Sequence, residues 1–327
     1  MRILVLLLSF FSTSLLANEL VVFTSRNEHL IKDIFQQYEK KTGVKINYRT
    51  GEPGALIQAL KAGGENSSAD ILLTVDAGNL WFAKNEGLFR ALDSEILNKT
   101  IPTHLKDPDN HWFGLSLRAR TFVYNPNKIQ TSELSTYEDL ANPKWKGRLC
   151  LRTSKKVYNQ SLVAMLIDQH GEEKTQQIVK GWVENAVDIF ANDNAVMKAI
   201  SAGQCDIGIV NTYYYGRLMQ EDSKLPLKLF WPNQDSTGVH INVSGAGVLK
   251  QSKRPEEAQK FLEWLASSEA QNSFAAINME YPVLSGTAWD PLVESWGKFK
   301  QNTSFQLSKA GVLQQDAIKL MHHVQYR

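Results

Sequence analysis

Three consecutive tyrosines, Tyr213, Tyr214 and Tyr215, stand in the segment NTYYYGRL near the middle of the chain. Neighbouring side chains face opposite ways in a strand and fan around the axis in a helix, so the three phenols cannot all enter one hydrophobic core. A phenol is neutral at pH 7, because its ordinary pKa is near 10, but a highly charged cation stabilises its anion. Hard cations prefer oxygen donors, and three phenolates would neutralise one trivalent iron. The alternative is a patch that stacks on sugars or forms an interface.

The N-terminus indicates that the chain is exported. The segment MRILVLLLSFFSTSLLA has one basic residue, an apolar run and then small residues up to Ala17. This pattern is typical of a signal peptide, which we expect at residues 1–17 with cleavage after Ala17. A retained anchor is the alternative, but a membrane span needs about 20 apolar residues and serines interrupt this run.

Composition places the chain among ordinary globular proteins. Of its 327 residues, 43% are apolar and 21% are charged, which argues against disorder. Removal of residues 1–17 takes away only Arg2 among the charged residues, so the formal net charge falls from +2 to +1. No concentrated basic run is present, and a nucleic-acid partner is therefore not expected.

Both cysteines stand eight residues before a tyrosine: Cys150 leads to Tyr158, and Cys205 leads to Tyr213. Because an even number of cysteines in an exported chain usually pairs, we expect a Cys150–Cys205 disulfide, with two buried free thiols as the alternative. If the bridge ties the two segments near the beginnings of two strands, their polar ends emerge at the same edge. Tyr158, Tyr213 and Tyr214 would then converge there.

Hydrophobic periodicity predicts an alternation of strands and helices. Residues 19–25, 44–50 and 69–75 have the pattern of buried strands, and residues 27–43 and 55–63 between them that of helices. A second set of strands and helices follows from residue 113 to residue 267. This alternation predicts an α/β fold with a mainly parallel sheet whose ligands bind beyond the carboxyl ends of the strands. Two lobes joined by crossing strands suit the chain length better than one oversized sheet.

A family resemblance is carried by six segments together with the export signal. The segments are VVFTSRNEHLIKDIF, SADILLTVDAGNLW, LSLRARTFVYNP, KWKGRLCLRTS, VYNQSLVAMLI and CDIGIVNTYYYGRL. They resemble the periplasmic ferric-ion-binding proteins of bacterial ABC importers, the type II binding proteins also called bacterial transferrins, over essentially the whole mature chain. The resemblance implies two lobes, each a mainly parallel sheet flanked by helices, with the ligand cleft between them. It places the N-terminal lobe at 18–117 with about 240–292, and the C-terminal lobe at 118–239 with about 293–327.

The same resemblance implies a ligand set for ferric iron. The tyrosine of the YNQSL segment and the first two tyrosines of the NTYY segment ligate the metal in that family, which here are Tyr158, Tyr213 and Tyr214. Tyr215 lies outside this set, and we expect it to face away from the cleft or to line it.

A synergistic anion, carbonate or phosphate, binds beside the iron in this family. Its usual partner in the carbonate-type members is the first arginine of the LSxRAR motif, which here is Arg118, with Arg120 and Asn211 as further candidates. A guanidinium suits a planar oxyanion because its donors form a rigid fork.

The chain departs from the family pattern at the N-terminal lobe. Some members place a histidine, sometimes followed by a tyrosine, after the first strand, where this chain has Asn27 and Glu28, with His29 displaced by two residues. Others take a glutamate after the third strand, where this chain has TVDAG. We therefore expect the N-terminal lobe to lend no protein ligand to the metal, His29 to face solvent, and Asp76 to cap the following helix.

The resemblance implies a function and several alternatives to test. It implies that a monomer in the periplasm captures Fe³⁺ with carbonate, bicarbonate or phosphate and delivers it to an inner-membrane ABC permease and its ATPase. Ferrous iron or an iron chelate is left open as the cargo. Catalysis is not expected, because the GxSxG and HExxH patterns are both missing.

The main rival is a binding protein of the same fold for an organic solute such as a sugar phosphate, thiamine or a polyamine. Its site would use aromatic faces, which Trp81, Trp112 and Trp231 could supply. A structural or adhesive domain is the third alternative.

Overall fold

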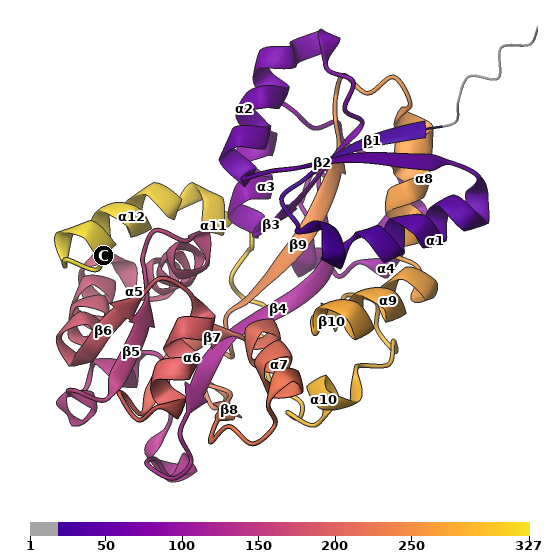
Figure 1. Ribbon diagram of the computed structural model, residues 1–327. Helices are drawn as coiled ribbons and strands as arrows, with labels where there is room; N and C mark the ends of the chain where they lie inside the picture. Colours follow the sequence, from indigo (N-terminus) through magenta and orange to yellow (C-terminus); the bar gives the residue numbers. More distant parts are fainter. Residues whose placement is uncertain (1–18) are drawn as a thin grey trace, which may run out of the picture.

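Two lobes lie on either side of a pair of long central strands in the computed structural model, which describes residues 19–327 apart from the side chains of residues 275 and 276 (Figure 1). The predicted signal peptide at residues 1–17 lies outside this range. The N-terminal third of the chain builds most of one lobe, and the segments around β5, β6 and β7 build most of the other.

The strands form a single mixed sheet within the described residues. They are β1 (Glu19–Thr24), β2 (Lys45–Thr50), β3 (Ile71–Val75), β4 (Phe113–Tyr124), β5 (Leu149–Arg152), β6 (Ala186–Phe190), β7 (Ile207–Asn211), β8 (Lys228–Phe230), β9 (Ile241–Val248) and β10 (Tyr281–Pro282).

Helices cover the sheet in each lobe (Figure 1). They are α1 (Lys32–Thr42), α2 (Pro53–Gly63), α3 (Ala77–Asn85), α4 (Glu95–Thr100), α5 (Val157–Asn185), α6 (Asp193–Ser201), α7 (Thr212–Glu221), α8 (Pro255–Leu265), α9 (Ser268–Asn278), α10 (Pro291–Glu294), α11 (Lys309–Val312) and α12 (Gln314–His323).

The strand order is β2-β1-β3-β9-β4-β7-β5-β6, with β8 and β10 pairing with β4. Strands β1, β2 and β3 are parallel in one lobe, and β5, β6 and β7 are parallel in the other. Strands β4 and β9 run antiparallel to their neighbours and make the sheet mixed. Residues 113–119 of β4 pair with β9 and residues 120–124 pair with β7, so one continuous strand passes from the first lobe to the second.

Local sequence signals account for the helices that the periodicity predicted. Helix α1 buries Ile34, Phe35 and Tyr38 and ends at Gly43, whose φ of 75° is a left-handed conformation that glycine adopts without strain. Helix α5 is interrupted at Gly171, whose φ is also 75°.

None of the helices within residues 19–327 has both the length and the apolar character that crossing a membrane requires.

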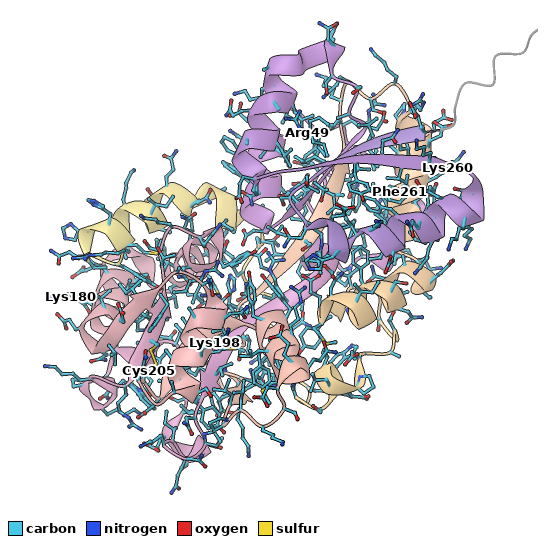
Figure 2. The ribbon with its side chains drawn as sticks, in the orientation of Figure 1. Arg49, Lys180, Lys198, Cys205, Lys260 and Phe261 are labelled. Carbon is cyan, nitrogen blue, oxygen red and sulfur yellow. A yellow bond between two sulfur atoms is a disulfide. The ribbon has the colours of Figure 1, made fainter. Side chains whose placement is uncertain are left out.

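The structure confirms the disulfide between Cys150 and Cys205 (Figure 2). Cys150 lies in β5, and Cys205 lies just before β7, the parallel neighbour of β5. Both residues are buried in a hydrophobic cluster. The bridge therefore fixes the beginnings of two strands whose opposite ends carry the tyrosine segments.

Reduction of this disulfide should lower the thermal stability of the protein. The cysteines are 55 residues apart, and the chain-entropy model gives a stabilisation of about 4 kcal/mol for a loop of that size. Thermal unfolding in reductant, with thiols counted to establish complete reduction, measures the change. The Cys150→Ala/Cys205→Ala variant is the control, because its melting should not respond to reductant. Unchanged melting of the fully reduced protein would contradict the stabilising role.

Candidate metal centre

Tyr158, Tyr213 and Tyr214 line one cavity of about 90 Å³ at the junction of the lobes. Tyr158 is the second residue of α5, which follows β5, and the other two stand in the first turn of α7, which follows β7. Because β5 and β7 are parallel neighbours, the helices that follow them begin at the same edge of the sheet. The structure thus brings the three phenols together from two separated segments.

The opposite wall of the cavity comes from the ends of strands in the N-terminal lobe. Its residues, together with Arg217 of α7, complete the lining: Ser25, Arg26, Asn27, Leu30, Val75, Arg217 and Glu280. None of these residues was predicted from the sequence as part of the site. The sequence indicated only that some ferric-ion-binding proteins have a ligand in the segment after the first strand. The signal that could have identified Ser25 to Asn27 is their place directly after β1, at the carboxyl end of a parallel strand.

Arg26 and Glu280 form a buried ion pair in that wall. Both Nη atoms of Arg26 lie 3.0 Å from Oε2 of Glu280, and Ser116 Oγ donates to the same oxygen at 2.6 Å. Although burial opposes ionisation, the nearby Arg26 and Arg118 guanidinium groups leave the pKa of Glu280 below its ordinary value. The N-terminal wall therefore contributes a charged pair, with a carboxylate facing the tyrosines across the cavity.

The rings of Tyr213 and Tyr214 lie against each other, with 4.3 Å between their centroids. Guanidinium groups surround them: that of Arg217 lies 5.0 Å from the Tyr213 ring, and that of Arg152 lies 5.8 Å from the Tyr214 ring and 5.0 Å from the Tyr158 ring. The site therefore combines oxygen donors that can become anions with fixed cations behind them.

Burial raises the pKa of two of these phenols. Burial is the main reason why the pKa of Tyr158 is raised and why the pKa of Tyr213 lies well above its ordinary value. Tyr214 adds to both shifts by charge repulsion, while the Arg118 guanidinium opposes both. A cation that binds these oxygens as phenolates must therefore displace protons.

Tyr215 faces away from the cavity, which is the first of the two orientations expected from the sequence. Its hydroxyl donates to the carbonyl of Leu227 at 3.3 Å, and its ring packs against Trp296 with 5.6 Å between centroids. Burial raises the pKa of Tyr215 to about 12. The third phenol of the run is thus part of a hydrophobic cluster beneath α7.

Arg118 lies behind Tyr158 and outside the cavity lining. Its guanidinium is 5.4 Å from the Tyr158 ring, and its Nη1 donates to Ser244 Oγ at 3.2 Å. Its Nη2 lies 3.8 Å from Asp76 Oδ2 and, among the described residues, has no hydrogen-bond partner although it is buried. Nη2 of Arg118 is therefore free to donate to a further acceptor.

Arg120 and Asn211 also lie behind the tyrosines and not in the cavity lining. They face each other across the β4–β7 ladder, and both are almost completely buried.

Asp76 caps α3, as expected, by accepting a hydrogen bond from the backbone of Gly78 at 3.0 Å. Its carboxylate is buried and also accepts from Ser161 Oγ at 2.7 Å and from Asn242 at 2.9 Å. The bond from Ser161 links the N-terminal lobe to α5. The expectation for His29 is also confirmed, because its side chain is exposed.

The tryptophans that would serve an organic solute do not line the tyrosine cavity. Trp112 is fully buried, and Trp231 stacks on Phe299 with 4.0 Å between ring centroids. Trp81 packs against Gly311.

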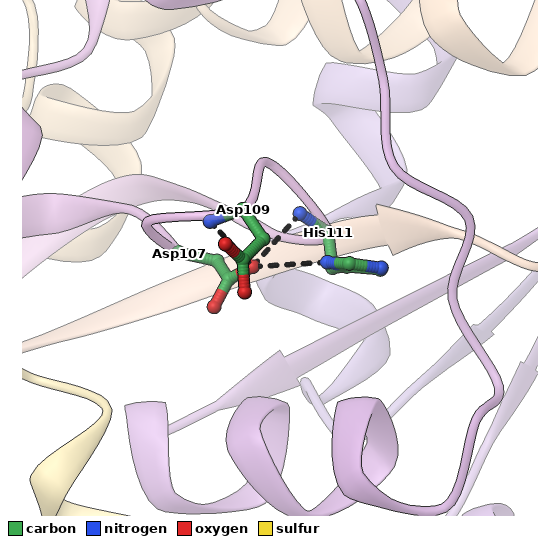
Figure 3. A group of neighbouring side chains, drawn as sticks. All are labelled: Asp107, Asp109 and His111. Carbon is green, nitrogen blue, oxygen red and sulfur yellow. Dashed lines mark hydrogen bonds and ion pairs between the residues drawn. The ribbon is translucent and has the colours of Figure 1, made fainter.

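A second cluster of possible metal ligands lies in the loop before β4, at Asp107, Asp109 and His111 (Figure 3). The ammonium group of Lys84 already lies 2.8 Å from the carboxylate of Asp107 and 2.7 Å from that of Asp109. His111 Nδ1 lies 3.1 Å from the other Asp107 oxygen. The lysine supplies the positive charge that a metal would bring, so the cluster is accounted for as an ion-pair network.

Comparison with known proteins places the chain among solute-binding proteins of iron uptake systems. The chain is 42% identical to iron uptake protein A1 of Synechocystis over 94% of its own length and 88% of that protein. It is 32% identical to the Fe(3+)-binding periplasmic protein of Serratia marcescens over 83% of its own length and 81% of that protein.

Solved structures agree with these relatives. The Trichodesmium protein described as IdiA or FutA, in complex with iron and citrate ligands, superimposes with a TM-score of 0.91 at 43% identity, covering 94% of this chain and 100% of that one. The ferric binding protein from Campylobacter jejuni gives a TM-score of 0.88 at 34% identity, with the same coverage of both chains. Residues 66–303 match the family model for bacterial extracellular solute-binding proteins. The chain belongs to the bacterial extracellular solute-binding protein family, and its two-lobed fold is that of the ferric-ion-binding proteins.

Proposed function

We propose that this protein captures ferric iron outside the cytoplasm and delivers it to an ABC importer. The observation that carries the proposal is the convergence of Tyr158, Tyr213 and Tyr214 in one small cavity between the lobes. The relatives support it, because those from Synechocystis and Serratia are named for iron uptake and Fe(3+) binding, and the Trichodesmium structure is described with iron.

The three tyrosines act as anionic ligands in this proposal. Three phenolate oxygens cancel the charge of one trivalent cation, and ferric iron is a hard ion that prefers such donors. The cavity of about 90 Å³ suits a metal ion with a few light atoms, since one water occupies about 30 Å³ in the liquid. Its size and the absence of tryptophan from its lining disfavour an extended organic solute.

A small oxyanion completes the coordination of the iron. Arg26 and Arg217 line the cavity and offer guanidinium donors from opposite lobes. Arg118 remains a candidate through its unfilled Nη2 behind Tyr158. Carbonate and carboxylates share the planar geometry that a guanidinium fork matches, and the citrate in the Trichodesmium structure is a carboxylate.

Closure of the two lobes retains the metal. We assign 18–117 with about 240–292 to the N-terminal lobe and 118–239 with about 293–327 to the C-terminal lobe. The register of β4 supports this division, because its pairing changes from β9 to β7 between Ala119 and Arg120. Hinge bending of such crossing segments is a common way to close binding proteins around a ligand.

The relatives named as periplasmic proteins support a proposal for the cellular setting. We propose that the mature protein works in the periplasm as a monomer, after cleavage of the signal peptide behind Ala17. It passes iron to an inner-membrane permease and its ATPase without a catalytic step of its own.

Replacement of Tyr214 by Phe should remove one anionic donor while keeping the ring. We expect iron affinity to fall by more than about 100-fold, because loss of a direct ligand should exceed the usual cost of losing an outer-shell contact. Tyr215→Phe is the matched control, since it changes the next residue of the same helix but leaves the cavity intact. Titration with ferric iron, followed by the phenolate-to-iron absorption in the visible range, measures both. Equal affinities for the two variants would remove Tyr214 from the ligand set.

Iron affinity should rise with pH. The raised pKa values of Tyr158 and Tyr213 mean that both are protonated between pH 5 and 8 before a metal binds, so each phenolate bond formed releases a proton. With three such bonds, acidification by one pH unit should weaken binding by up to about 1,000-fold. Competition against a chelator of known pH dependence gives the slope, which should fall by about one proton in the Tyr214→Phe variant. A pH-independent affinity would contradict phenolate ligation.

Removal of the anion should weaken iron binding. In buffer freed of bicarbonate and other carboxylates, we expect at least about a tenfold loss of affinity, equivalent to about 1.4 kcal/mol. Adding back bicarbonate, citrate or phosphate one at a time identifies the anion by which of them restores the affinity. The same affinity in all four buffers would show that no synergistic anion takes part.

A further inference from the structure

The two helices that bring the tyrosines to the cavity begin without side-chain caps. Helix α5 begins after Lys156 and helix α7 begins after Asn211, and neither start has a side-chain capping bond. Three ligands of one metal must nevertheless keep a fixed mutual geometry, because displacement by even about 1 Å weakens a site. Some other contact must therefore fix the start of α5 relative to the start of α7.

The side chain of Arg120 makes that contact. Its Nε and Nη2 donate to Asn159 Oδ1 at 3.0 and 2.5 Å, and its Nη1 lies 3.3 Å from Asn211 Oδ1. Asn159 directly follows Tyr158, and Asn211 stands two residues before Tyr213. A single guanidinium thus bonds to both ligand-bearing segments.

The remaining donors of Arg120 are also occupied. Nη1 lies 3.3 Å from Asp193 Oδ1, and Nη2 lies 3.2 Å from the carbonyl of Ile209. A guanidinium has five N–H donors, and these contacts together with those to the two asparagines use all of them. No donor is left for an anion.

We propose that Arg120 is a positioning residue that holds Tyr158 in register with Tyr213 and Tyr214. The inference rests on the proposed function, and it assigns Arg120 a role other than that of an anion partner. A planar fork with several donors suits this task, whereas the ammonium of lysine is a point charge with three donors and cannot span the same acceptors.

The surroundings of Arg120 make it a rigid support. It is 1% exposed, its backbone nitrogen donates to the carbonyl of His240 at 3.0 Å, and its own carbonyl accepts from the hydroxyl of Tyr137. The position of Arg120 in the crossing strand β4 is therefore fixed at the backbone as well as at the side chain.

Asn159 is held equally firmly on its other side. Its amide nitrogen donates to the carbonyl of Arg152 at 2.8 Å, to that of Thr153 at 3.0 Å and to the hydroxyl of Tyr326 at 2.9 Å. Arg152 in turn bonds to Asp193 at 2.7 Å. This closed network of buried groups leaves Tyr158 little freedom to shift unless the contact from Arg120 is lost.

The test compares Arg120→Lys with the wild-type mature protein and with Arg148→Lys. Arg148 is the matched control, because it bonds to Asp206 in the same lobe at 2.7 Å but contacts neither ligand segment. We expect Arg120→Lys to release ferric iron to a competing chelator about 10- to 100-fold faster and to shift the phenolate-to-iron absorption band. Arg148→Lys should release iron at the wild-type rate with an unchanged band.

A second variant keeps the inference testable if Arg120→Lys does not fold. Asn211→Ala removes the bond from Arg120 to the Tyr213 segment, together with the 3.5 Å contact from Asn211 Nδ2 to the Tyr213 hydroxyl, and leaves the pairing of Arg120 with Asp193. It should therefore show the same changes as Arg120→Lys. Folded variants that lose thermal stability but keep the wild-type release rate and band would overturn the inference, since Arg120 would then serve stability alone. If the wild type itself gives no such band with ferric iron, the proposed function fails instead.

Discussion

Three phenolate oxygens cannot share a small cavity unless a highly charged cation lies among them. Without it, burial and mutual repulsion favour the neutral forms of Tyr158 and Tyr213, whose pKa values are raised. With it, each negative charge gains a strong attraction in a region from which most water is excluded. Metal binding therefore depends on the charge of the cation and on pH. Neighbouring guanidinium groups favour the phenolate form even where they do not contact the metal, because their positive charge acts to lower the pKa of Tyr158 and Tyr213.

The scaffold meets this constraint by joining two helix starts at one sheet edge. Strands β5 and β7 are parallel neighbours, the disulfide fixes their beginnings, and α5 and α7 carry the tyrosines from their ends. Strand β4 passes from one lobe to the other, and the ion pair of Arg26 with Glu280 lines the same cavity from the N-terminal side. The contact from Ser161 to Asp76 adds a direct link between the helix that carries Tyr158 and the N-terminal lobe. Positioning and closure thus depend on the same small set of elements.

Local patterns in the sequence predicted much of this arrangement. The alternating apolar segments predicted the parallel strands and their helices, and the position of Asp76 predicted the helix cap. The even number of cysteines in a chain with an export signal predicted the disulfide. Each of these features depends on residues close together in the chain or on a simple pairing rule.

Features that depend on distant residues could not be predicted in the same way. The sheet is mixed because β9 joins it from far along the chain, and Arg26 meets Glu280 across 254 positions. The LSxRAR motif marks Arg118 and Arg120 as important but does not tell which way each guanidinium points. Alternation along β4 places both on one face, and only the packing of α5 and α7 against that face decides that Arg120 bonds to Asn159 and Asn211 while Arg118 lies under Tyr158.

A crystal structure of the iron-loaded protein, with anomalous diffraction measured at the iron absorption edge, tests the central claim most directly. The account predicts one strong anomalous peak between the lobes, with the hydroxyl oxygens of Tyr158, Tyr213 and Tyr214 each about 2 Å from it. A peak elsewhere would contradict the account. So would a peak between the lobes that lies farther than a hydrogen-bond length from two or more of these oxygens.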